Sequence, residues 1–120
     1  IADRALTNIL KHFEMMDGQP ETRQRDGSPG TRHMMVRDAA GYSFAPAGGL
    51  FEPRNVVSDI CKAGDLAGLL HFVEDVDRAP IEVRYQCDGV LWMSAGPGRV
   101  QRGDAVAVLM EDYDEARAAA

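Results

Sequence analysis

The chain has 120 residues, of which 45% are apolar and 27% charged, as is typical of one soluble globular domain. Its formal net charge is −6 and no basic stripe is present, which argues against nucleic acid and anionic membranes as partners. No run approaches 18 apolar residues, so we expect no membrane span. The first residue is Ile rather than Met, and we expect a segment cut from a longer polypeptide.

The first segment has the apolar periodicity of an amphipathic helix. Apolar side chains recur at spacings of three and four, namely Leu6, Ile9, Leu10, Phe13 and Met16. We predict a helix over residues 1–17, ended by Gly18 and Pro20. A helix of about 15 residues is marginal by itself, so its apolar face requires a packing partner. The missing upstream chain is the natural candidate.

Residues 18–30 contain no large apolar side chain and are rich in Gly, Pro and polar residues. This composition predicts a linker or mobile loop, and hence a domain boundary.

From residue 31 onward the pattern changes to short apolar segments separated by turn signals. We predict seven strands, at 32–37, 42–45, 49–52, 66–73, 81–85, 90–93 and 105–110. Seven short strands in this length favour a small sandwich or barrel. The predicted fold class is therefore mainly β: a small antiparallel barrel over residues 31–115, with one N-terminal helix.

An internal repeat supports two similar halves. The segment Cys61-Lys62-Ala63-Gly64-Asp65 parallels Val100-Gln101-Arg102-Gly103-Asp104, and an apolar strand follows each. Gly supplies positive φ and Asp bonds the local backbone, so each Gly-Asp pair predicts a turn. Such a repeat resembles the barrel-sandwich hybrid of lipoyl and biotinyl domains. The modified Lys of those carriers has no counterpart, since the only lysines are Lys11 and Lys62.

The order of these motifs resembles the C-terminal domain of the succinylglutamate desuccinylase/aspartoacylase family. The matching segments are residues 47–53 (Ala-Gly-Gly-Leu-Phe-Glu-Pro), 60–68 (Ile-Cys-Lys-Ala-Gly-Asp-Leu-Ala-Gly), 88–91 (Asp-Gly-Val-Leu) and 100–104 (Val-Gln-Arg-Gly-Asp). Residues 4–13 resemble the last helix of that family's catalytic domain. The resemblance extends to a branch that includes deacetylases of N-acetyl-diaminobutyrate.

The resemblance implies a zinc-dependent hydrolase that deacylates N-acyl amino acids. The family's zinc ligands, a His-x-x-Glu pair and a later His, lie upstream of the helix that opens this chain. We therefore expect no catalytic residue and no metal ligand in the chain itself, and zinc only in the parent enzyme. The expected partners are the upstream catalytic domain of the same polypeptide, the small N-acyl amino-acid substrate of the parent and, in a homo-oligomer, further copies of the chain. The alternative is a non-enzymatic, lipoyl-like barrel that serves as a protein-binding or assembly module.

One pair imitates the family's zinc motif. His71-Phe72-Val73-Glu74 reads His-x-x-Glu, but no histidine follows it in the sequence. A catalytic zinc requires three protein ligands, and residues three apart in a strand point to opposite faces. We interpret the pair as a strand end that leads into a solvated turn.

Three charged residues are candidates for the rim of the parent's substrate entrance, namely Arg32, Glu52 and Arg54. Pro53 stiffens the backbone between the last two and could preorganise them. Cys61 and Cys87 are expected to be reduced, partly buried thiols, which suits a cytoplasmic protein.

Overall fold

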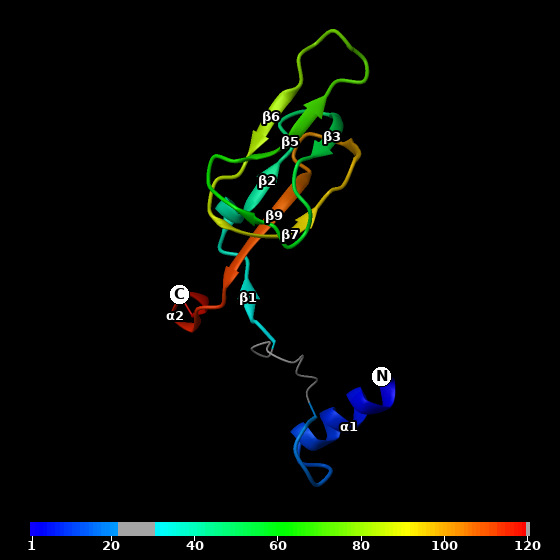
Figure 1. Ribbon diagram of the computed structural model, residues 1–120, viewed down its shortest axis with the longest axis vertical. Helices are drawn as coiled ribbons and strands as arrows, with labels where there is room; N and C mark the ends of the chain where they lie inside the picture. The colour runs from blue at the N-terminus through cyan, green and yellow to red at the C-terminus, as the bar shows by residue number, and fades with distance from the viewer. Residues whose placement is uncertain (22–30, 120) are drawn as a thin grey trace. The chain divides into compact units, whose positions relative to one another are not determined.

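The computed structural model describes residues 1–21 and 31–119, so most of the predicted linker lies outside the described residues. The chain divides into two units, Ile1–Arg32 and His33–Ala120. The elements of the chain, most of which are labelled in Figure 1, are in order α1 (Ala2–His12), β1 (Met34–Met35), the 3-10 helix η1 (Ala39–Gly41), β2 (Tyr42–Phe44), β3 (Gly49–Pro53), β4 (Ile60–Cys61), β5 (Leu66–His71), β6 (Ile81–Arg84), β7 (Gly89–Ser94), β8 (Gly98–Val100), β9 (Ala105–Asp112) and α2 (Glu115–Ala118).

Helix α1 ends at His12, earlier than the sequence predicts. The amide of Glu14 donates to the carbonyl oxygen of Lys11 (3.2 Å), and that of Met15 donates to Leu10 (2.9 Å). These two bonds form a Schellman motif, with Glu14 in the left-handed position at φ 57°. A glutamate, and not the downstream glycine, therefore occupies the left-handed position that terminates the helix.

The apolar face of α1 is exposed within its own unit. No residue of the helix is buried, and the large side chains Leu6, Ile9 and Phe13 are each more than half exposed. A helix of this length gains most of its stability from packing, so this face is suited to being covered. No helix in the described ranges is long and apolar enough to cross a membrane.

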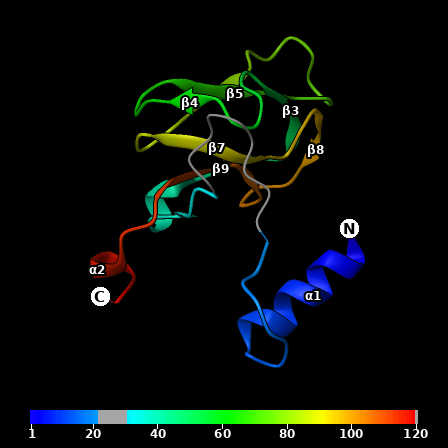
Figure 2. The same cartoon turned by 60° about the horizontal axis from the view of Figure 1, so that its bottom comes forward.

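The second unit consists of two antiparallel sheets. One contains the path β1-β9-β7-β4 with β2 also paired to β9, and the other has the order β6-β5-β3-β8. Figure 2 shows β3 and β5 in a layer separate from β7 and β9. The prediction of a mainly β fold with one N-terminal helix is confirmed. The described strands form two sheets and no closed barrel.

Both sheets contribute to a single core. The largest fully buried side chains are Phe51, Leu70, Leu91, Leu109, Val106, Val108 and Cys61. Burial alternates along β3, where Phe51 faces inward and its neighbours face outward, as expected for a half-buried strand. The outward face of the four-stranded sheet carries charged residues, including Glu52 and Glu82.

Several strand predictions need correction. The strand predicted at 32–37 is reduced to Met34–Met35, because pairing with β9 covers only two residues. Two short strands, β4 and β8, were not predicted. Each pairs over only two or three residues, and a segment that short cannot show a recognisable alternation of apolar and polar residues.

The predicted repeat is confirmed by matching hydrogen bonds. We call residues 62–65 the Gly64 turn and residues 101–104 the Gly103 turn. In each turn the aspartate carboxylate accepts from the amide three residues earlier, at 3.0 Å and 2.8 Å respectively. The glycines have φ +88° and +91°, a conformation that glycine adopts without a steric penalty.

Each turn is also held to a neighbouring segment by a pair of backbone bonds. The Gly64 amide donates to the carbonyl oxygen of Tyr85, and the Tyr85 amide donates back to Asp65. The same exchange joins the Gly103 turn to Ala45, with distances of 2.8 to 3.0 Å across the two turns. The two halves of the repeat are therefore built in the same way.

A third copy of this turn lies at residues 56–59, where the sequence shows no glycine. We call it the Ser58 turn. The Asp59 carboxylate accepts from the Val56 amide at 3.0 Å, and Ser58 has φ 87°. The Ser58 amide donates to Leu91 (2.8 Å), and the Leu91 amide donates back to Asp59 (2.9 Å). Serine thus occupies the strained position that glycine occupies in the other two copies.

This substitution pattern predicts opposite effects at equivalent positions. We expect Ser58→Gly to raise the free energy of unfolding by about 0.5–1 kcal/mol, because relief of left-handed strain exceeds the entropic cost of glycine. We expect Gly64→Ala to lower it by about 1 kcal/mol or more. A new methyl group at Gly64 meets no atom within 4 Å, so only backbone strain contributes. Urea denaturation measures both changes in the free energy of unfolding. If both variants changed it in the same direction, the two turns would not be equivalent.

Candidate functional site

The structure places the three rim candidates in different surroundings. Glu52 lies in β3, and its Oε2 is 2.7 Å from Nε2 of His71 across the β3–β5 pairing. Arg54 follows β3, with its amide bonded to the carbonyl oxygen of Ala67 (3.0 Å) and its side chain exposed. Arg32 belongs to the N-terminal unit, so only Glu52 and Arg54 are placed in one structural frame.

The His71-x-x-Glu74 pair does not act as a unit. The His71 imidazole contacts Glu52, whereas Glu74 lies beyond the end of β5. Across the described residues, no group of three or more His, Cys, Asp or Glu side chains is positioned to hold a metal ion. The residues that the structure describes therefore do not by themselves fit the zinc site that the family resemblance implies for the parent enzyme.

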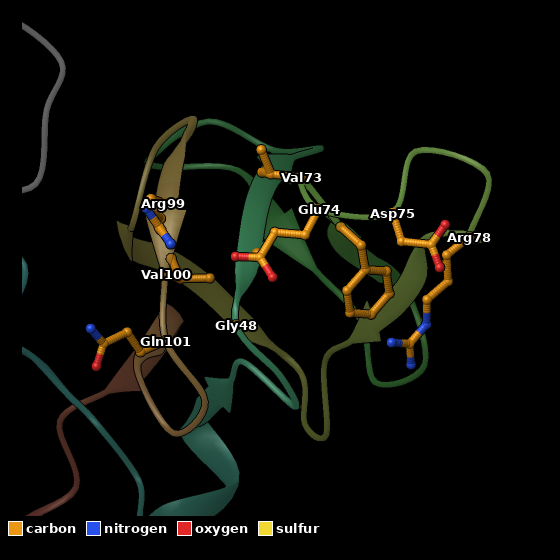
Figure 3. A pocket seen from close by; sticks show the side chains of 10 residues that line it. Gly48, Val73, Glu74, Asp75, Arg78, Arg99, Val100 and Gln101 are labelled. Carbon is orange, nitrogen blue, oxygen red and sulfur yellow. The ribbon is translucent and has the colours of Figure 1, made fainter.

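A cleft of about 410 Å³ is lined in part by Glu74 (Figure 3). Its walls come from the start of β3, the β5–β6 connection and β8. Figure 3 shows Glu74 directed toward the side that carries Arg99, while Asp75 and Arg78 lie together at the other side. The guanidinium carbon of Arg78 is 3.8 Å from the centroid of the Phe72 ring, a cation–π contact.

The charges of the cleft favour binding of small charged groups. A guanidinium such as that of Arg99 presents a planar fork of donors that matches a carboxylate. Glu74 and Asp75 would attract a cation. The walls of the cleft therefore present both signs of charge on exposed side chains.

A second charged cluster joins β9 to the segment that follows β1. Glu111 lies in β9, and its Oε2 accepts from both Nη2 (2.7 Å) and Nε (3.0 Å) of Arg37. The pKa of Arg37 is raised, chiefly by its hydrogen bond to Glu111. Glu111 begins an acidic run over residues 111–115, a composition that favours a solvated terminus. The structure corrects this for Glu111, because β9 continues to Asp112 and its pairing with β1 holds the glutamate in the sheet.

Both cysteines are buried free thiols. Desolvation by burial raises the pKa of each thiol. The Cys87 Sγ donates to the carbonyl oxygen of Ala40 at 3.3 Å, a weak bond that holds the neutral form. A thiol with a raised pKa is a poor nucleophile, so neither residue has the environment of a catalytic cysteine.

We expect these thiols to resist alkylation in the folded chain. A raised pKa lowers the fraction of thiolate at pH 8, and burial hinders the reagent. Mass spectrometry after iodoacetamide treatment should show almost no label on the native chain and two labels after unfolding. The reaction should accelerate as pH rises, because the reactive thiolate then becomes more populated. Rapid labelling of one native thiol at pH 7 would show an activated cysteine.

Comparison with known proteins identifies close relatives. A crystal structure of succinylglutamate desuccinylase/aspartoacylase from Rhodobacter sphaeroides is 57% identical, with a TM-score of 0.82 over 93% of this chain and 34% of its own. N-alpha-acetyl-L-2,4-diaminobutyric acid deacetylase from Halomonas elongata is 26% identical over 111 residues, which are 92% of this chain and 31% of the relative.

A further solved structure agrees with these two. The product-bound ectoine utilization protein EutE (DoeB) from Ruegeria pomeroyi is 25% identical, with a TM-score of 0.73 over 91% of this chain and 32% of its own. No protein-family model matches the chain. The chain spans about a third of the length of these relatives. Its sequence and its fold therefore match those of solved members of the succinylglutamate desuccinylase/aspartoacylase family.

Proposed function

We propose that this chain is the C-terminal, non-catalytic domain of a zinc-dependent hydrolase that removes the acyl group from N-acyl amino acids. The observation that carries the proposal is the 57% identity, over 93% of the chain, to a succinylglutamate desuccinylase/aspartoacylase. The curated relative is a deacetylase, which supports N-acyl amino acids as the substrate class. The chain matches about a third of each relative, so the other two thirds are available to hold the catalytic residues.

The proposed architecture of the second unit is a barrel-sandwich hybrid. The two turns of the repeat use the same hydrogen bonds, as expected if two similar halves are related by a pseudo-two-fold axis. The two antiparallel sheets would then be the two layers of the sandwich. We also propose a cytoplasmic location, since both cysteines are free thiols in a domain that needs no disulfide.

In the parent enzyme, zinc would supply a bound water of lowered pKa as the nucleophile. The contribution of this chain would be a rim at the substrate entrance. Glu52 is held by His71 at 2.7 Å, and the next exposed charge along the chain is Arg54. These two residues would offer both signs of charge to an amino-acid substrate, and Arg32 is the third candidate for the rim.

A chimera tests the proposal. The third of the Rhodobacter sphaeroides protein that matches this chain is replaced by this chain, and we call the product the family-length chimera. It is assayed with N-acetyl-diaminobutyrate, N-acetylaspartate and succinylglutamate, with the unmodified relative as control. We expect hydrolysis of the substrate that the relative itself hydrolyses. A folded, zinc-loaded chimera without turnover would show that this chain cannot serve as that domain.

The isolated chain provides the complementary measurement. Its zinc content by mass spectrometry should be far below one per chain, and it should release no acetate from N-acetyl-diaminobutyrate. One zinc per chain together with hydrolysis would overturn the assignment as a non-catalytic domain. His71 and Glu74 would then be the first residues to substitute.

The rim is tested in the active chimera. We expect Glu52→Gln and Arg54→Gln each to lower kcat/KM by about tenfold, corresponding to about 1.4 kcal/mol for one charged contact to the substrate. Glu82→Gln is the matched control, because Glu82 is an exposed residue of β6, also ion-paired on the same sheet. Unchanged kcat/KM in both rim variants would remove these residues from the rim.

A further inference from the structure

The three copies of the repeated turn present different side chains at equivalent positions. The first two positions hold Lys62 and Ala63 in the Gly64 turn, and Gln101 and Arg102 in the Gly103 turn. In the Ser58 turn they hold two valines. All three turns are closed by the same aspartate hydrogen bond. The turn therefore forms without apolar residues at these positions, so the formation of the turn does not explain the two valines.

These apolar side chains are exposed. Val56 is 70% exposed and Val57 is 54% exposed, while Ile60, which follows the turn, is 77% exposed. The residues that follow the other two turns, Leu66 and Ala105, are half-buried. Single exposed aliphatic residues are ordinary, but a cluster within one short segment is a mark of a contact surface.

A tryptophan extends the cluster. Backbone bonds join the Ser58 turn to Leu91, and Ile60 pairs with Val90, so the turn lies along β7. Leu91 points into the core, and the next residue, Trp92, is 56% exposed. Tryptophan is one of the residue types enriched at the energetic centres of protein interfaces. We call Val56, Val57, Ile60 and Trp92 the apolar turn patch.

Hydrogen bonds hold the backbone of the turn that carries Val56 and Val57. The Asp59 carboxylate and the two bonds to Leu91 fix the turn at both ends. Ser58 keeps a left-handed backbone that costs a non-glycine residue energy, and such strain often persists at functional surfaces. A rigid turn loses little conformational entropy on binding, which favours docking.

We propose that the apolar turn patch docks on the part of a family-length polypeptide that this chain does not contain. The inference rests on the proposed function, in which two thirds of the parent lie outside this chain. Size distinguishes this occupant from a second copy. A stable interface between separate molecules uses roughly 20–30 residues on each side, far more than the patch provides. A covalently tethered partner is present at an effective concentration of roughly millimolar, so a small patch suffices.

The experiment compares Val57→Asp in the isolated chain and in the family-length chimera. Arg102→Asp is the matched control, because Arg102 occupies the equivalent exposed position of the Gly103 turn. In the isolated chain both variants should leave the melting temperature unchanged, since both side chains face solvent. In the chimera only Val57→Asp should lower it, by several degrees. A chimera insensitive to Val57→Asp would overturn the proposal.

Hydroxyl-radical footprinting gives a second measurement that does not depend on activity. Oxidation of Trp92 and Ile60 should fall severalfold in the chimera relative to the isolated chain. Protection without turnover would support the docking of the patch and refute the proposed function. Turnover without protection would support the proposed function and overturn the docking. If the chimera does not fold, the chain is footprinted with the separately expressed remainder of the relative, and lack of protection there overturns the docking.

Self-association is the remaining outcome. Analytical ultracentrifugation of the isolated chain should show a monomer at micromolar concentration. A dimer that Val57→Asp dissociates, and Arg102→Asp does not, would assign the patch to a second copy instead and overturn the proposal.

Discussion

Phe51→Ala should lower the free energy of unfolding of the second unit by about 3–5 kcal/mol, the cost of removing a fully buried aromatic side chain. Phe51 is 1% exposed and lies in β3, inside the core that both sheets share. Its removal leaves a cavity that strands on either side cannot fill without breaking their pairing. Because domains of this size are stable by only about 5–15 kcal/mol, the variant should be close to unfolding at 37 °C.

The neighbouring residue provides the control for this substitution. Leu50 is in the same strand and 45% exposed on the outward face. Leu50→Ala should change stability by less than about 1 kcal/mol, because it removes little buried area and opens no cavity. Guanidinium denaturation of both variants separates inward from outward positions of β3. Similar losses in both would contradict the alternation of this strand.

Gly68→Ala should destabilise the second unit by about 2–3 kcal/mol, the upper part of the range for overpacking. A methyl group at Gly68 would lie 2.5 Å from the carbonyl oxygen of Glu52 and 2.5 Å from the Phe51 ring. The carbonyl belongs to the β3–β5 ladder and cannot move without loss of pairing. β5 therefore needs glycine at this position so that the aromatic ring can lie across it.

A matched glycine and a double variant test this explanation. Gly98 has no atom within 4 Å of a new methyl group, so Gly98→Ala should be nearly neutral. In the double variant Phe51→Ala/Gly68→Ala, the ring that blocks the methyl group is absent. The combined loss should then be smaller than the sum of the single losses. Strict additivity would mean that the backbone contact with Glu52 alone sets the cost of Gly68→Ala.

The candidate surfaces were only partly accessible from the sequence. Glu52 and Arg54 could be selected because they are charged and flank Pro53, but their environment depends on β5, which brings His71 to Glu52. The sequence does not predict the apolar turn patch, because Ser58 stands where the other two turns have the glycine that indicates a turn. A serine in a left-handed conformation leaves no compositional signal, so only the backbone geometry reveals the third copy.

The sequence by itself determined the fold class, the amphipathic character of the first helix and the two Gly-Asp turns, because these depend on local periodicity and on the conformational freedom of glycine. The order of its short motifs also indicated a resemblance to the family whose members the chain matches in sequence and fold. The tertiary structure alone decided that the strands form two sheets, that His71 contacts Glu52 instead of Glu74, and that Glu111 is ion-paired. These contacts join residues 19 and 74 positions apart, and strand pairing over such separations is set by packing rather than by local preference.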